Sequence, residues 1–187
     1  MSKAKPKISS KSSSTFPYLV VGVDPGKSGG IAWITPNRVI TATSMPEGEE
    51  ELRQLVESIE EVAEDLSPAR GDVEVFVFIE QVGVMPGQGI SSAFTFGTGF
   101  GMLRQAFSIF PREFIRPQVW QKGLQIPPTD KKGGESKPQY KDRLRMKARQ
   151  LFPKLGCWDW GLGAQRSVCD AILIAEYGRR KLLGGLK

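Results

Sequence analysis

The sequence contains no histidine and only two cysteines, Cys157 and Cys169. The lack of histidine excludes a Ser-His-Asp triad and every metal site that depends on imidazole. Two thiols make neither a disulfide framework nor a zinc site, which needs about four ligands. Any catalysis must therefore rest on carboxylates, lysine, serine or cysteine, and carboxylates bind hard cations such as Mg²⁺.

Long apolar runs are also missing, since no stretch approaches the ~18–20 residues of a membrane span. We therefore expect no membrane partner. The 187 residues are 40% hydrophobic and 25% charged, which is typical of a soluble globular protein. This length fits one ordinary domain. The net charge of +6 suits a polyanionic partner, although overall charge alone is a weak argument.

The first 16 residues lack acids and hold four lysines and six serines. So few apolar side chains cannot offset the entropy lost on ordering, so we expect a disordered tail at 1–16 and one globular domain at 17–187. The tail is alternatively a DNA-contacting arm or part of an organellar targeting peptide, which is typically rich in serine and poor in acids. This favours a plastid or another organelle, with a phage or bacterial cytoplasm as the alternative.

Alternation and apolar runs predict the secondary structure. Strands are expected at Tyr18–Asp24, Gly30–Thr35, Arg38–Ser44, Asp72–Glu80 and Glu113–Arg116, the last closed by Pro117. The first three are expected to form an antiparallel meander. Helices are expected at Glu47–Leu66, Ser91–Phe107, Tyr140–Phe152 and Gln165–Leu183, with loops at Gln81–Gly89 and Pro127–Pro138.

Three acids stand out by their positions. Asp24 follows the run VVGV and Glu80 follows VFVFI, so each lies where a buried strand leaves the core. Asp170 precedes the run AILIA on the last helix. If the two strands are neighbours, both carboxylates emerge at one edge of the sheet, and a helix across that edge adds the third.

Three converging carboxylates repel one another, and two Mg²⁺ ions about 3.5–4 Å apart would neutralise them. Such a pair activates a water on one side and stabilises the leaving oxygen on the other, which is phosphodiester hydrolysis without histidine. The alternatives are structural. Asp24 would cap a turn, Glu80 would pair with a lysine or arginine, and Asp170 would pair with Arg166 four residues earlier.

Three segments, GVDPGKSGGIAWI, FIEQV and SVCDAILIAEYGRR, resemble the active-site segments of the RuvC family of Holliday junction resolvases, in the RNase H-like superfamily. The similarity covers nearly all of residues 18–183, including GTGFGMLRQAF, VWQKGL and KDRLRMKARQLFP. Within the family, the chain looks closest to the phage-type and plastid resolvases.

This resemblance implies an α/β, RNase H-like fold with a five-stranded mixed sheet flanked by helices. It also implies a homodimer that makes paired nicks across a four-way DNA junction, without a small-molecule cofactor. Two Mg²⁺ ions per site, with Mn²⁺ as a substitute, would be bound by Asp24, Glu80 and Asp170.

The chain departs from the family pattern at Ser167, where many members have an aspartate or histidine three residues before the last aspartate. A serine can orient a water but is a poor Mg²⁺ ligand, which indicates either three-carboxylate ligation or an impaired site. Cys169 is not a ligand for a hard cation and is expected to pack as a small hydrophobic residue. Lys141 matches a lysine that resolvases place near the scissile phosphate, and we expect it to contact phosphate or stabilise charge.

A basic segment, Asp130–Arg149, carries eight lysines and arginines against three acids and is expected to bind phosphates. The candidates for DNA contact are Lys131, Lys132, Lys137, Lys141, Arg143, Arg145 and Lys147, and a solvated helix face is the alternative. Gly97 and Gly101 lie one turn apart on a helix, which favours close packing or close approach to DNA. Gln88 is a candidate for reading a base edge.

Other functions remain open at this point. The DPGKSGG turn resembles the phosphate-binding turn of actin-like ATPases, but those proteins need a second such domain. A junction-binding scaffold with an inactive site is a non-enzymatic alternative, raised by Ser167. A nuclease of the same fold that cuts flaps or RNA hybrids is a third, and substrate competition would separate it from a resolvase.

Overall fold

A computed structural model of the chain describes residues 17–70, 72–83, 87, 89–130 and 132–186. One five-stranded sheet with the strand order β3-β2-β1-β4-β5 forms its centre. The strands are β1 (Tyr18–Asp24), β2 (Gly30–Ile34), β3 (Ile40–Ser44), β4 (Glu74–Glu80) and β5 (Arg112–Ile115). The expectation of a disordered tail at 1–16 lies outside the described residues.

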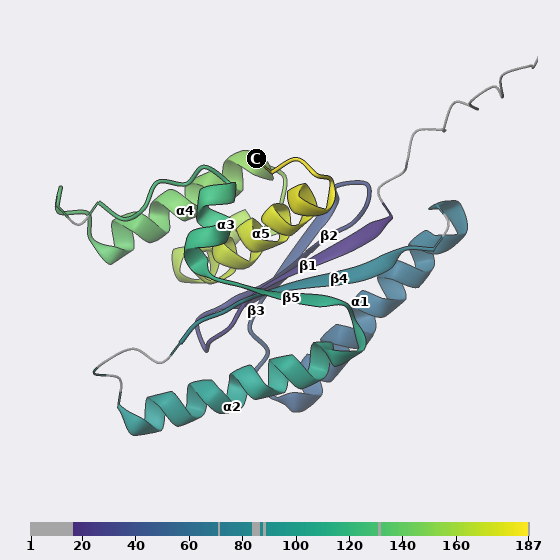
Figure 1. Cartoon of the computed structure of the whole chain (residues 1–187), viewed down its shortest axis with the longest axis horizontal. Helices are drawn as coiled ribbons and strands as arrows, with labels where there is room; N and C mark the ends of the chain where they lie inside the picture. Colours follow the sequence, from purple (N-terminus) through teal and green to yellow (C-terminus); the bar gives the residue numbers. More distant parts are fainter. Residues whose placement is uncertain (1–16, 71, 84–86, 88, 131, 187) are drawn as a thin grey trace, which may run out of the picture.

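The sheet is mixed, because β2 is antiparallel to both of its neighbours, β1 and β3, while β4 and β5 run parallel to β1. The predicted meander is therefore confirmed. Helices cover both faces, with α1 and α2 on one side and α3, α4 and α5 on the other (Figure 1). Their bounds are α1 (Glu49–Arg70), α2 (Ile90–Ala106), α3 (Pro117–Gly123), α4 (Lys137–Leu151) and α5 (Leu162–Leu182), with short 3₁₀ turns at η1 (Phe107–Ile109) and η2 (Gly156–Asp159). The expected α/β fold, a five-stranded mixed sheet flanked by helices, is confirmed.

The core consists of two apolar layers separated by the sheet. Successive side chains of a strand point to opposite faces, so Val20 belongs to the layer under α5 while Val21 belongs to the layer under α1. The sequence predicts the burial of both faces from the unbroken apolar runs of β1 and β4. Among the described residues, no helix is long and apolar enough to cross a membrane.

Helix α5 lies unusually close to the sheet because two glycines remove side chains from the contact. A Cβ added to Gly22 on β1 would lie 2.3 Å from the carbonyl oxygen of Ala171 and from the backbone nitrogen of Ala175. A Cβ added to Gly178 on α5 would lie 2.2 Å from the ring of Phe78. The backbone of α5 therefore rests directly on β1, which fixes where its N-terminal half meets the end of that strand.

Several element bounds differ from the sequence prediction. Helix α3 was not predicted, because Pro117 was interpreted as closing a strand, whereas proline is also favoured in the first turn of a helix. The basic helix begins at Lys137 because Ser136 forms a capping box with Gln139, which shortens the expected Pro127–Pro138 loop. Helix α5 begins at Leu162, three residues before the predicted start.

Candidate active site

The carboxylates of Asp24 and Glu80 lie at one edge of the sheet. Strands β1 and β4 are adjacent and parallel, with Val23 opposite Ile79, so the residue that follows each lies at the same edge. Both acids are almost completely buried, with 9% and 7% of their surface exposed. The two strand ends that the sequence singled out are therefore neighbours in space.

Asp170 reaches this edge from the other layer. It is on α5, it is 7% exposed, and its charge acts on both Asp24 and Glu80. The contact between the backbones of α5 and β1 at Gly22 is what brings it there, since Asp170 immediately precedes Ala171. The structure thus brings the three predicted acids together, although their roles remain predictions.

The local electrostatics are unfavourable for three ionised acids. Burial raises the pKa of Asp24 well above its ordinary value, and the charges of Asp170 and Glu80 raise it further while Lys141 opposes them. Burial also raises the pKa of Glu80, against the opposing hydrogen bond from Trp120. Groups in such an arrangement are stabilised by a cation, and perturbed acids of this kind are concentrated at functional sites.

Lys141 supplies the positive charge of the site. Its ammonium group, carried by α4, donates a hydrogen bond of 2.5 Å to Oδ2 of Asp170. Burial lowers the pKa of Lys141, but the charge and hydrogen bond of Asp170 and the charge of Asp24 together raise it above its ordinary value. The lysine therefore stays protonated and offsets part of the negative charge of the three acids.

Two donors that the sequence did not identify hold the carboxylates. The indole nitrogen of Trp120, on α3, donates to Oε1 of Glu80 at 2.7 Å, and the Trp120 side chain is fully buried. The single proton of the Cys169 thiol has two acceptors in reach, Oδ1 of Asp170 at 3.2 Å and the carbonyl oxygen of Arg166 at 3.1 Å. Cys169 is fully buried, as expected for a small hydrophobic residue, and additionally contacts a site acid. Because α3 was not predicted, only the recognised VWQKGL segment pointed to Trp120.

The structural alternatives for the three acids are not observed. In the described part of the chain, Asp24 makes no side-chain hydrogen bond to its turn, and Glu80 makes no ion pair within 4.0 Å. Arg166 donates two hydrogen bonds to Asp142 on α4, at 2.9 and 2.5 Å. Asp170 therefore pairs with Lys141 and not with Arg166. Asp24 and Glu80 are thus not explained by a salt bridge or turn capping, whereas Asp170 does form an ion pair, with Lys141.

Ser167 lies one turn before Asp170 on α5, with its side chain turned to its own helix. Its hydroxyl donates to the carbonyl oxygen of Gly163 at 3.1 Å. This is the usual bond of a serine within a helix to the residue four positions earlier. The hydroxyl therefore makes no contact with an acid of the site in this arrangement.

The donor set suits a hard divalent cation, because it offers buried carboxylate oxygens and a surplus of negative charge. Among the described residues, no three acids or thiols already form a closed cluster that would hold a metal ion. The ammonium of Lys141 lies against Asp170 instead. The chemistry of the carboxylates therefore fits a hard divalent cation.

The predicted DNA-contacting residues fall into two groups. Arg143 donates to Glu135 and to the carbonyl oxygens of Pro127 and Pro128, and Arg145 donates to Gln165, so both arginines hold the fold. Lys132 and Lys137 are exposed and Lys147 is half-buried, so all three remain candidates for phosphate contact. Lys131 and Gln88 lie outside the described residues.

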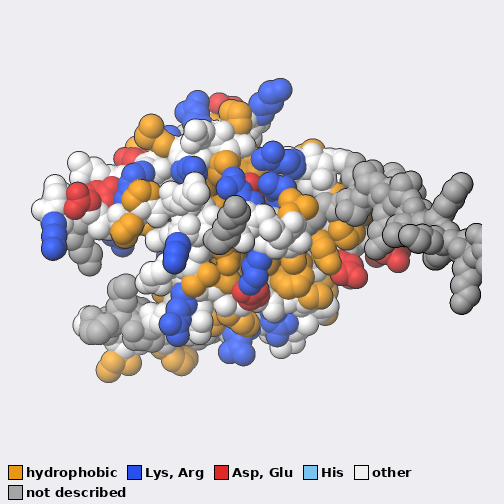
Figure 2. All heavy atoms as spheres, turned by 45° about the horizontal axis from the view of Figure 1, so that its top comes forward, with side chains coloured by type: hydrophobic (Ala, Val, Ile, Leu, Met, Phe, Trp, Pro, Cys, Tyr) orange, Lys and Arg blue, Asp and Glu red, His pale blue; other side chains and the backbone are white. Residues whose placement is uncertain are grey.

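Other basic side chains near the carboxylate edge were missed by the sequence interpretation. Lys27 lies in the turn after Asp24 and is exposed. Arg116 directly follows Ile115, which pairs with Glu80 across the sheet, and it is exposed too. The signal was available, since Lys27 lies three residues after the predicted strand that ends at Asp24 and Arg116 ends the strand predicted at Glu113–Arg116. Figure 2 shows lysine and arginine side chains (blue) spread over one face of the molecule, where acids (red) are fewer.

Gly97 and Gly101 do not serve close packing within the chain. Among the described residues, a Cβ added to either glycine would meet no atom within 4 Å apart from the neighbouring backbone of α2 itself. The sequence offered two interpretations of these glycines, close packing and close approach to DNA. Close packing against the described sheet and helices of this chain is excluded, so the interpretation that remains is close approach to another molecule.

No family model matches the sequence, and no curated protein matches it. Among solved structures, the chain is similar to RuvC of Thermus thermophilus in complex with a Holliday junction substrate, at 17% identity and a TM-score of 0.49, over 91% of this chain and 98% of that one. A structure of Thermus thermophilus RuvC gives 18% identity and a TM-score of 0.47, over 90% and 98%. The yeast mitochondrial Holliday junction resolvase Ydc2 gives 13% and 0.43, over 89% and 80%. These three structures are of Thermus thermophilus RuvC and of a mitochondrial Holliday junction resolvase.

Proposed function

We propose that this protein is a structure-selective endonuclease that hydrolyses phosphodiester bonds in branched DNA and resolves four-way junctions by paired nicks. The observation that carries the proposal is the convergence of three buried acids, Asp24, Glu80 and Asp170, at one edge of the sheet. Such a surplus of buried negative charge costs stability without a ligand and is therefore explained by a function.

The residues of the site have distinct roles in this proposal. Asp24, Glu80 and Asp170 hold the metal ions through carboxylate oxygens, and Trp120 keeps Glu80 oriented. When bound, two Mg²⁺ ions would supply the charge that offsets the acids, lower the pKa of a water and stabilise the leaving oxygen. Mn²⁺ would substitute for Mg²⁺, because it takes the same oxygen ligands.

Lys141 is proposed to bind the phosphodiester beside the acids. An ammonium group has three N–H donors, and Asp170 takes one of them. The remaining donors are available for a phosphate oxygen, and the charge of the group attracts the substrate. Lys132, before α4, and Lys137, its first residue, are both exposed and extend this attraction along the DNA. We therefore expect binding to depend strongly on salt.

Paired nicks require two copies of the site, and the outer face of α2 is proposed to join them. Ile90 and Phe94 are 90% and 76% exposed, and Gly97 continues the same face one turn further on. A symmetric contact would cover these apolar groups, and Gly97 would allow two helices to approach closely in the N-terminal half of α2. Light scattering should give a dimer for the wild type and a monomer for Phe94→Asp, whereas Val39→Asp, at a remote exposed apolar position, should remain dimeric.

The decisive experiment is cleavage of a labelled four-way junction in the presence of excess linear duplex, with and without Mg²⁺. Wild type and Asp65→Asn, which alters an exposed acid on α1, should make symmetric nicks, and Asp24→Asn should make none. Equal cleavage by Asp24→Asn and Asp65→Asn would overturn the assignment of the site.

Ser167 gives one specific reason for a second candidate, a catalytically impaired protein that binds junctions as a scaffold. Its hydroxyl is held by Gly163, so it does not act as a ligand in this arrangement. Tight junction binding with no nicks in Mg²⁺ or Mn²⁺ would favour this candidate. Preferential cutting of flaps or RNA hybrids in a substrate competition would instead identify a related nuclease of the same fold.

A further inference from the structure

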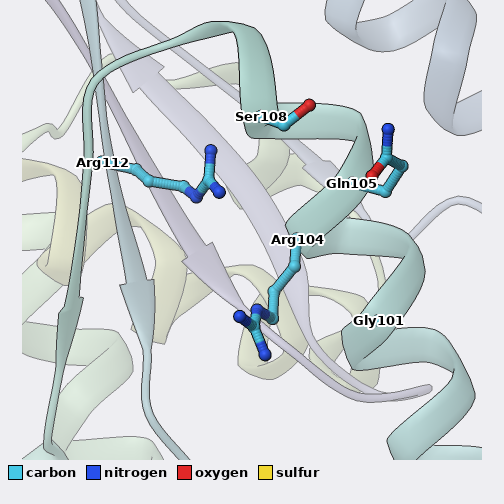
Figure 3. A pocket seen from close by; sticks show the side chains of 5 residues that line it. All are labelled: Gly101, Arg104, Gln105, Ser108 and Arg112. Atoms are coloured by element: carbon cyan, nitrogen blue, oxygen red, sulfur yellow. The ribbon is translucent and has the colours of Figure 1, made fainter.

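A basic hollow lies on the α2 side of the sheet, away from the three acids. It has a volume of about 280 Å³ and lies between the C-terminal part of α2 and the edge strand β5. Its lining consists of Gly101, Arg104, Gln105, Ser108 and Arg112. Figure 3 shows that the side chains of Arg104 and Arg112 project from opposite walls into the space between helix and strand.

The two arginines of this hollow are held by neutral groups only. The guanidinium of Arg104 lies 5.5 Å from the ring centroid of Phe114, and Arg112 donates to the carbonyl oxygen of Phe107 at 3.2 Å. Within the described part of the chain, neither has a carboxylate within 4.0 Å, and the neighbouring Glu113 pairs with Lys181. By contrast, Arg53, Arg143, Arg166, Arg179 and Arg180 all pair with acids.

The lining of the hollow has the chemistry of an oxyanion receptor. Two guanidinium groups, a serine hydroxyl and a glutamine amide offer hydrogen-bond donors, and no acid lines the space. Arginine matches the geometry of phosphate oxygens and is the usual residue for binding them. Two like charges that share one hollow repel each other, and a bound anion would relieve that repulsion.

The surroundings limit the direction from which an anion can arrive. Glu49, Glu57 and Glu60 line a separate groove between α1 and α2, which shares only Gly101 and Gln105 with the basic hollow. These acids would repel a polyanion on the α1 side. A phosphate group must therefore approach along β5, the open edge of the sheet.

This edge connects the hollow to the candidate active site. Arg112 begins β5, and Ile115 at its end pairs with Glu80. Three residues of a strand span about 10 Å, which corresponds to about three base pairs at ~3.4 Å per pair. Arg116, the residue after Ile115, is exposed and adds a positive charge at the active-site end of β5.

We propose that Arg104, Gln105, Ser108 and Arg112 form a phosphate-binding subsite that takes a backbone phosphate of a DNA arm, outside the cleaved position. The DNA part of this proposal rests on the proposed function, whereas the binding of a phosphate group does not. The subsite would hold an arm in register along β5 while the three acids act on the bond that is cut.

Salt dependence of junction binding tests the DNA part. The variant Arg104→Gln with Arg112→Gln removes both charges, and the logarithmic salt slope should fall by about one, since each phosphate contact contributes about 0.9. Affinity near 0.1 M salt should fall roughly three- to tenfold. The matched control is Arg38→Gln with Lys154→Gln, which removes two exposed charges outside the hollow, one between β2 and β3 and one after α4, and should leave the slope unchanged. Equal slopes for the two double variants would overturn the proposal.

Inorganic phosphate, titrated into the full-length protein at constant ionic strength, tests the subsite directly. The backbone amide signals of Gln105, Ser108 and Arg112 should shift and saturate in the wild type, and the shift should be lost in the double glutamine variant. Replacing both arginines by lysine should restore the salt slope, and thermal unfolding should show that every variant is folded. Saturable phosphate binding with an unchanged salt slope would overturn the DNA assignment, and no saturable binding would overturn the subsite. If the wild type does not bind junctions at all, the proposed function fails, while the phosphate titration still decides the subsite.

Discussion

Replacing Trp120 by phenylalanine is expected to weaken metal binding at the candidate site, because Glu80 loses its hydrogen-bond donor. The substitution keeps an aromatic ring in a fully buried position but removes the N–H that donates to Oε1 of Glu80 at 2.7 Å. Glu80 is 7% exposed, so solvent cannot readily replace this donor. The carboxylate is then free to rotate away from the position in which we propose that it binds metal.

The size of the effect follows from burial and charge. Loss of a hydrogen bond to a charged group costs about 1.5–3 kcal/mol, and the smaller ring leaves a cavity that adds about 1 kcal/mol. The free energy of unfolding should therefore fall by about 2–4 kcal/mol. For a domain of this length, each 1 kcal/mol lowers Tm by about 2–4 °C, so a fall of roughly 4–16 °C is expected.

Trp158→Phe is the matched control, because Trp158 is also buried and donates at 2.7 Å, but to the carbonyl oxygen of Phe152. Both variants should lose stability, and only Trp120→Phe should bind Mn²⁺ more weakly in a calorimetric titration. Terbium luminescence gives a second measurement, since Tb³⁺ bound by Glu80 would lie beside the Trp120 ring and be sensitised by it. Equal Mn²⁺ affinity and equal luminescence in the two variants would refute the reasoning.

Three further predictions concern the same region and the helix that carries it. Gly22→Ala should lower the free energy of unfolding in urea by about 3 kcal/mol or more and reduce cleavage, because the new Cβ would lie 2.3 Å from backbone atoms of α5 and displace Asp170. Asp24→Asn should raise the Tm of the metal-free protein near pH 7 by removing a buried charge whose pKa is raised, and this gain should vanish below about pH 4, where the aspartate is protonated in the folded and unfolded states. Glu176→Gln should lower the free energy of unfolding by about 2 kcal/mol at pH 7. Burial raises the pKa of Glu176, but Arg179 and Arg180 lower it below its ordinary value in the folded protein. The stability lost in the variant should therefore shrink as the pH falls through the pKa of Glu176 in the folded state. A loss that stays constant down to pH 3 would contradict the last prediction.

The sequence by itself determined the strands, most of the helices and the acids at their ends. Alternation and apolar runs are local properties, so β1 and β4 and the acids that follow them, Asp24 and Glu80, could be recognised without any knowledge of the fold. The apolar run after Asp170 likewise placed that acid on a buried helix. The resemblance of three short segments then predicted the sheet that brings these acids together.

Local patterns were less informative where a residue is compatible with two different local structures. Pro117 was interpreted as the end of a strand, whereas it begins α3 and thereby orients Trp120 toward Glu80. Ser136 and Gln139 form a capping box, which moved the start of α4 to Lys137. In each case the local signal allows two structures, and the packing of the finished fold selects one.

Only the tertiary structure decided which side chains touch. Trp120 and Glu80 are 40 residues apart in the sequence and Lys141 and Asp170 are 29 apart, so no periodicity relates them. The meeting of these groups depends on α5 lying directly on β1, and that contact exists because Gly22 lacks a side chain where two backbones meet. The chemistry of the site is thus encoded in the residue types, while its geometry follows from close packing between segments that are distant in the chain.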